Sequence, residues 1–224
     1  MLASFFHLHP DPEPWIERLL ARWLWRGWVH GYGRSGQTPA LRQAVRTVHP
    51  TRRKPAVAPS AYKAVESLLS AVQADPPPFF DPHGFRTDSA SGRLSLLALV
   101  QLHPRGPNGD LVDPAAEIER FGVEAITDLV PGHRGNLAAR GFWPKDAAGP
   151  TGLEPQVILT SQGIDADTAH ALAVGDVPGF LSRRAATLEG HITQFLTSRV
   201  EPGAQVRPPL VDLFVPDDDG DEVP

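Results

Sequence analysis

The sequence predicts a mainly α-helical fold: an irregular multi-helix domain with Pro- and Gly-rich loops and an extended acidic C-terminal tail. Apolar residues recur at helical spacing in several stretches, and no stretch alternates strongly enough to predict a sheet. The 24 Pro and 20 Gly residues, about a fifth of the 224 residues, interrupt these stretches and exclude a long coiled coil.

Three helices are expected in the first third of the chain. In the first helix, Trp15, Leu19 and Trp23 recur at every fourth position and form one apolar face. Thr38 and Ser60 are suitable N-caps for the second and third helices, because their side chains accept hydrogen bonds from the first turn. The expected ranges are Pro14 to about Gly27, Pro39 to Val48, and Ser60 to about Asp75.

The rest of the chain predicts further helices joined by tight turns. The run Leu94–Leu102 is almost continuously Leu, Ala and Val, which predicts a central core helix that begins after Ser89 or Ser91. Asp165 is a suitable N-cap for a later helix. The other expected elements are Pro114–Phe121, Val123–Val130, a short apolar element at Val157–Leu159, a helix from Asp165 through Val174, and a long helix from Asp176 or Val177 to about Arg199.

Charge is distributed unevenly, although the net charge is only -5. Residues 1–54 contain nine basic and three acidic residues, whereas the last thirteen residues contain six acidic and no basic ones. We expect a helical domain over residues 1–206, with a basic, Pro-broken segment at 49–59 that fits a linker. We expect residues 207–224 to form an extended acidic tail, which fits plain solubilising disorder, a mimic of DNA, or a segment that covers the basic N-terminal face.

Several classes of function are excluded or disfavoured by composition. With no Cys, the chain has neither disulfides nor thiolate chemistry. No apolar run is long enough for a membrane span and no leader pattern begins the sequence, so we expect a cytoplasmic protein without a membrane partner. Metal-binding His pairs, a nucleophilic Ser elbow and a phosphate-binding Gly loop are all missing, and we expect no cofactor.

The N-terminal arginines are candidates for nucleic-acid binding. Arg18, Arg22 and Arg26 form a row on the first helix, beside the face that carries Trp15 and Trp23. The full candidate set is Arg18, Arg22, Arg26, Arg42, Arg46, Arg52 and Arg53. The alternative is a solvated basic face beside core tryptophans, because the acidic remainder of the chain opposes long-range attraction to DNA.

One local pattern is similar to that of HNH-type nucleases. Asp128-Leu129-Val130-Pro131, followed by His133 and Asn136-Leu137, resembles their Asp-His-Ile-x-Pro and Asn-Leu layout. In those enzymes the second residue is a His that activates water beside a bound divalent metal. Here that residue is Leu129, so the resemblance implies a degenerate site in which His133 would have to act as the base.

Longer stretches resemble GmrSD-type bacterial restriction proteins. Their Leu-Arg-Arg-Trp-Phe-Trp-Arg signature is similar to the stretch that ends at Arg22-Trp23-Leu24-Trp25-Arg26, and the resemblance continues almost to the acidic tail. The stretches that carry it further are Gly109–Asp113, Asn136–Pro144 and Phe180–Arg184. In that family these features follow an N-terminal ParB/sulfiredoxin-like catalytic domain marked by Asp-Gly-Gln-Gln-Arg, a motif that this sequence does not contain.

The resemblance therefore implies a non-catalytic helical module of a bacterial defence system that restricts modified DNA. Such a module would act as an interaction or scaffold element beside a catalytic nucleotide-binding subunit or domain. An exposed apolar patch that includes Phe5, Phe6 and Trp28 is the expected partner interface. The two alternatives are a nucleic-acid-binding protein that uses the N-terminal arginines and a degenerate nuclease around Asp128, His133 and Asn136.

Overall fold

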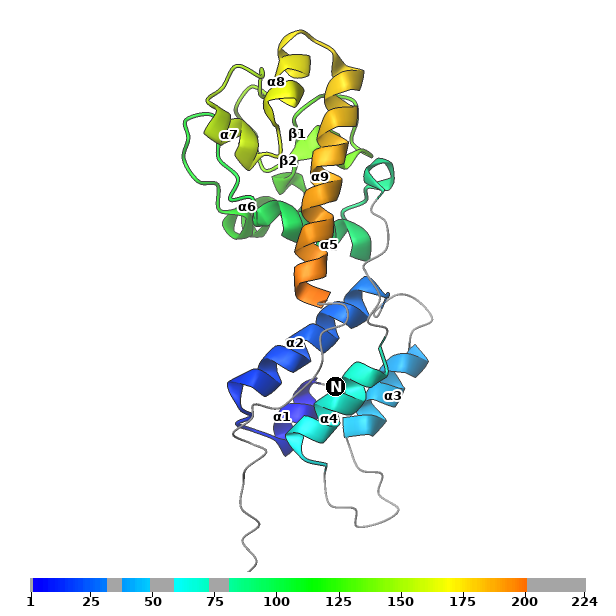
Figure 1. Cartoon of the computed structure of the whole chain (residues 1–224). Coiled ribbons are helices and arrows are strands. Elements are labelled where there is room, and N and C mark those ends of the chain that lie inside the picture. The colour runs from blue at the N-terminus through cyan, green and yellow to red at the C-terminus, as the bar shows by residue number, and fades with distance from the viewer. Residues whose placement is uncertain (1, 32–37, 49–58, 73–80, 201–224) are drawn as a thin grey trace, which may run out of the picture.

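The computed structural model describes residues 2–31, 38–48, 59–72 and 81–200. Within these residues the chain is mainly helical, as predicted, with nine α-helices, short 3-10 turns and one pair of very short strands. Figure 1 shows two parts: helices α1 to α4 form an N-terminal lobe, and helices α5 to α9 form a body above it. The lower end of α9 reaches down to α2, where the two parts meet.

The N-terminal lobe buries one apolar core. It consists of α1 (Leu2–Leu8), α2 (Pro14–Val29), α3 (Thr38–Val48) and α4 (Ala61–Ser70). The last three match the predicted helices, and Ser60 caps α4 by accepting a hydrogen bond from the Lys63 amide at 3.4 Å. Helix α1 was not predicted, because its seven residues carry too short an apolar pattern to stand out. Its Phe5 is fully buried against the other three helices.

The body is built around the long helix α9. The body helices are α5 (Ala90–Val100), α6 (Pro114–Phe121), α7 (Gln156–Ser161), α8 (Ala166–Ala173) and α9 (Val177–Val200). Their predicted N-caps are confirmed at Ser89, which accepts from the Gly92 amide, and at Asp165, which accepts from the Thr168 amide. Phe180, Leu188 and Ile192 of α9 are buried, as the helical pattern predicted.

The predicted helix at Val123–Val130 is wrong. Gly122, whose φ is +59°, ends α6, and a 3-10 turn over Gly122–Ala125 follows. The chain then becomes extended in β1 (Thr127–Asp128), which pairs antiparallel with β2 (Arg140–Gly141). The Thr127 hydroxyl donates to the carbonyl of Trp143, two residues beyond β2, at 2.9 Å, and this contact helps to hold the extended segment beside β2.

Helix α2 contributes to both the lobe and the body. Leu19, Leu20 and Trp23 lie in the core of the N-terminal lobe, whereas Val29 belongs to the body core that α5 and α9 form. Beside it, the rings of Trp25 and Phe195 meet edge to face with centroids 5.6 Å apart. We call this junction of α2, α5 and α9 the waist.

Two predicted segments fall outside the described residues. The basic segment 49–59 is described only at its last residue, and the acidic tail 207–224 is not described at all. The predicted domain boundary at residue 206 therefore stays a prediction. Among the helices of the described ranges, none has the length and apolar character needed to cross a membrane.

Candidate functional site

The predicted nucleic-acid-binding arginines lie on two helices of the N-terminal lobe. Arg18 on α2 and the pair Arg42 and Arg46 on α3 are exposed, while Arg22 is half-buried. The arginines of α2 and those of α3 belong to one lobe, because α4 packs against both helices. Arg52 and Arg53 lie outside the described residues.

Arg26 does not belong to that surface, which corrects the prediction. Only 4% of the residue is exposed, and its Nε donates a hydrogen bond to the Val200 carbonyl at 3.1 Å. That carbonyl is at the end of α9, where the last carbonyls of a helix lack partners within the helix. Arg26 therefore joins the N-terminal lobe to the body.

The predicted apolar interface is only partly correct. Phe5 is buried in the lobe core, because α1 folds back onto the other helices, and it is therefore not an interface residue. Phe6 and Trp28 are 39% and 40% exposed. Figure 1 shows α1 well away from the C-terminal end of α2, where Trp28 lies, so these two side chains do not form one patch.

An apolar groove lies at the waist near Trp28. Its volume is about 410 Å³, and Trp25, Leu97, Leu111 and Phe195 line it together with the turn at 103–104. The Trp28 ring meets the Trp25 ring at 5.8 Å, which extends the apolar surface outward from the groove. Leu111 is 63% exposed and Leu97 is 40% exposed. Exposed apolar side chains around a groove are typical of protein interaction sites.

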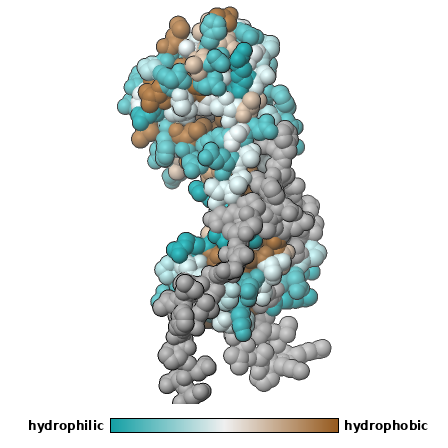
Figure 2. Space-filling model, in the orientation of Figure 1, coloured by the Kyte–Doolittle hydropathy of each residue, from teal (hydrophilic) through white to brown (hydrophobic). Residues whose placement is uncertain are grey.

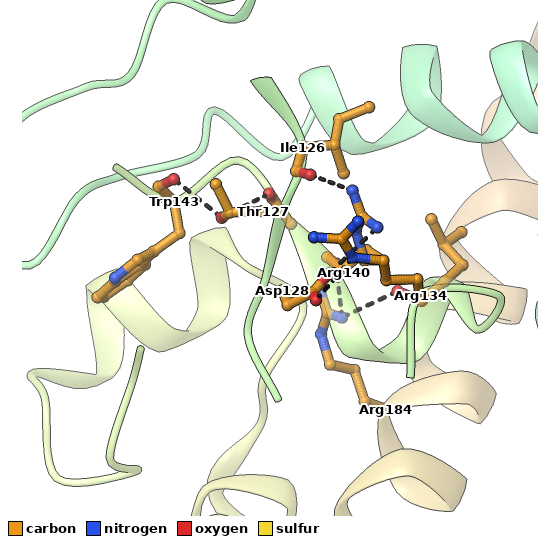
Figure 3. Close-up of polar contacts among 9 residues, drawn as sticks. Ile126, Thr127, Asp128, Arg134, Arg140, Trp143 and Arg184 are labelled. Carbon is orange, nitrogen blue, oxygen red and sulfur yellow. Dashed lines mark hydrogen bonds and ion pairs between the residues drawn. The ribbon is translucent and has the colours of Figure 1, made fainter. Parts of the chain in front are cut away.

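A cleft beside the β1–β2 pair is charged, in contrast to the apolar groove. Asp128 Oδ1 lies 3.1 Å from Arg140 Nη1, and its Oδ2 lies 3.4 Å from Arg134 Nε. Arg140 also donates to the Ile126 carbonyl. Figure 3 shows the two guanidinium groups side by side next to the single carboxylate. The strand pairing causes this arrangement, because Asp128 and Arg140 are register partners.

The nuclease-like pattern does not form a metal site among the described residues. Both oxygens of Asp128 are engaged by arginines, and His133 is exposed. The Asn136 side-chain oxygen caps the 3-10 turn Leu137–Ala139 by accepting from the Ala138 amide at 2.8 Å. In the described ranges, no three His, Asp or Glu side chains are grouped closely enough to hold a metal ion.

Arg184 supports the cleft from below (Figure 3). It is fully buried in α9 and donates to the carbonyls of Gln162, Ala138 and Arg140 at 2.6 to 3.0 Å. Burial lowers the pKa of its guanidinium to about 9, so it remains charged at neutral pH. Its contacts fix the backbone that carries Arg140, which makes Arg184 a positioning residue for the cleft.

Comparisons with family models, curated proteins and solved structures find no match for this chain. The cleft and the groove therefore rest on the geometry described above.

The sequence predicted neither the groove at the waist nor the cleft beside the β1–β2 pair. The groove combines side chains from α2, α5, α9 and the loop before α6, which are distant in sequence. The cleft depends on strand register between two-residue strands, which have no detectable periodicity. The available signal in the sequence was the close succession of the charged residues Asp128, Arg134 and Arg140.

Proposed function

We propose that this chain is a non-catalytic helical module of a GmrSD-like bacterial defence system that binds the nucleotide-binding catalytic domain of that system. The groove at the waist is the surface that would receive this partner. The observation that carries the proposal is the exposure of Trp28, Leu97 and Leu111 at or beside this groove, where Trp28 contacts Trp25. The resemblance of the chain to GmrSD-type proteins supports the identity of the partner.

The rim of the groove indicates what kind of segment would fit. The Arg199 guanidinium lies 4.9 Å from the centre of the Phe195 ring, at the edge of the apolar surface. His103 lies on the same rim. A segment that presents apolar side chains flanked by an acidic residue would complement both the groove and its basic edge.

The test measures binding between the full chain and a domain that carries the motif Asp-Gly-Gln-Gln-Arg and is encoded by a neighbouring gene. Leu111→Asp places a charge on the exposed wall of the groove and is expected to weaken binding by about tenfold or more, as at an interface hot spot. Leu111 is 63% exposed, so the substitution leaves the core intact. Isothermal titration calorimetry gives the affinity.

The matched control is Leu153→Asp. Leu153 is 81% exposed, precedes α7 in the chain and is not among the residues that line the groove. Figure 2 shows that apolar residues reach the surface of both the body and the N-terminal lobe. This variant is expected to bind as tightly as the wild type. Equal binding by Leu111→Asp and the wild type, or a loss confined to Leu153→Asp, would reject the groove as the interface.

Nucleic-acid binding is the second candidate, and the exposure of Arg18, Arg42 and Arg46 favours it. Binding of this type falls steeply as salt rises, because counterions are released from the phosphates. The double variant Arg42→Ala/Arg46→Ala should reduce affinity for a short duplex at about 50 mM salt and lower its salt dependence. Absence of wild-type binding under this condition rules out the candidate.

A further inference from the structure

The cleft beside the β1–β2 pair is independent of the groove and has the size of a small-molecule site. Its volume is about 750 Å³, within the usual range of about 300 to 1,000 Å³ for such sites. Its charged lining consists of four basic and three acidic residues: Arg86, Arg134, Arg140, Lys145, Asp88, Glu124 and Asp128. The lining thus carries one positive charge in excess.

That excess is concentrated where two arginines share one carboxylate. Asp128 can neutralise only one of Arg134 and Arg140, and both lie within 3.4 Å of its oxygens. Desolvation lowers the pKa of Arg140; the Asp128 charge opposes this, and the Arg134 charge lowers the pKa further. In the described part of the chain, the buried Nε of Arg140 has no hydrogen-bond partner, and neither has the buried Oδ1 of Asp128, whose contact with Arg140 is an ion pair. An added anion would stabilise this pair of cations.

The cations differ in how firmly they are held. The Arg140 side chain is 12% exposed and is fixed by Asp128 and by the Ile126 carbonyl. The Arg134 side chain is 80% exposed, and its contact with Asp128 is the longer of the two. Lys145 is half exposed and pairs with Glu124 at 2.8 Å on the rim. The cleft thus combines one positioned guanidinium with two cations that can turn toward a ligand.

We propose that this cleft binds a small ligand that carries a phosphate or pyrophosphate group, held by Arg140 together with Arg134 and Lys145. Phosphate oxygens suit this set, because guanidinium groups bind them through paired, charge-assisted hydrogen bonds. This site goes beyond the proposed function and does not depend on it.

The test uses pyrophosphate as the probe and the full chain at low ionic strength, measured by isothermal titration calorimetry. The wild type is expected to bind with one-to-one stoichiometry and a Kd of about 1 mM or lower. Arg134→Ala should weaken binding about three- to tenfold. Asp128→Asn keeps the shape of the side chain but removes the competing carboxylate, and it should tighten binding about threefold or more.

The matched control is Arg183→Ala, because Arg183 is also an exposed arginine with a long contact to an aspartate, Asp167, at 3.9 Å. It should bind like the wild type. No wild-type binding at about 10 mM pyrophosphate, or equal losses in Arg134→Ala and Arg183→Ala, would overturn the proposal. Displacement of pyrophosphate by single-stranded DNA would instead assign the phosphate to nucleic acid and reject a small ligand. Should Asp128→Asn fail to fold, the comparison of Arg134→Ala with Arg183→Ala decides the outcome.

Discussion

Arg184 shows how a single buried charge can organise a site. Its guanidinium binds the carbonyls of Gln162, Ala138 and Arg140, so it connects α9 to the loop after α7 and to β2. Arg184→Met keeps much of the volume but leaves these carbonyls unpaired in the core. We expect a loss of about 3 to 5 kcal/mol in the free energy of unfolding, measured by urea denaturation.

The neighbouring Arg183→Met is the control for this prediction. Arg183 is exposed and its ion pair with Asp167 is long, so its replacement should change the free energy of unfolding by less than about 0.5 kcal/mol. Similar losses in the two variants would show that Arg184 acts through general charge and not through its carbonyl contacts.

At the scale of one element, Asp165 links the stability of α8 to pH. Its Oδ1 accepts from the Thr168 amide at 2.8 Å and its Oδ2 accepts from the Thr187 hydroxyl of α9 at 3.1 Å. Desolvation raises the pKa of this carboxyl, but the hydrogen bonds from Thr168 and Thr187 outweigh it and hold the pKa below the ordinary 3.8. The folded protein therefore prefers the charged form.

This preference predicts that stability is fully present above the ordinary pKa and declines as pH falls from about 4 through the lower folded-state pKa. Asp165→Asn keeps a cap acceptor without the charge, so its melting temperature should fall less steeply in acid than that of the wild type. Asp165→Ala should cost about 1 kcal/mol at pH 7. Parallel acid profiles for the wild type and Asp165→Asn would contradict the assignment.

The helices that the sequence predicted correctly are those whose ends are set by neighbouring residues in the chain. The caps at Ser60, Ser89 and Asp165 are read from adjacent residues, and so are the helices that follow them. Arg26 illustrates the limit. Its place in a row with Arg18 and Arg22 is correct, but its burial depends on α9, 174 residues further along the chain. The groove and the cleft depend on similarly distant contacts.

At the scale of the whole molecule, the waist determines whether the N-terminal lobe and the body unfold together. Trp25 contacts Phe195 and Val29 belongs to the body core, whereas the other buried apolar residues of the lobe and of the body form separate cores. Trp25→Ala removes the edge-to-face contact with Phe195 across the waist and should cost about 2 to 3 kcal/mol. We expect calorimetry to resolve two unfolding transitions in this variant where the wild type shows one.

Trp28→Ala is the control, since Trp28 lies on the same helix and 40% of its residue surface is exposed. It should preserve a single transition and cost less than about 1 kcal/mol. A single transition in both variants would mean that the lobe and the body are coupled through other contacts, such as that of Arg26 with Val200.

The hydrogen bond from Arg26 to the Val200 carbonyl also has a consequence for biosynthesis. The core of the N-terminal lobe needs only residues up to Val72, which leave the ribosome early. Val200, whose carbonyl accepts the hydrogen bond from Arg26, is translated about 130 residues after Val72. The lobe can thus form during translation, while Trp25 and Arg26 lack their contacts with α9 until that helix emerges.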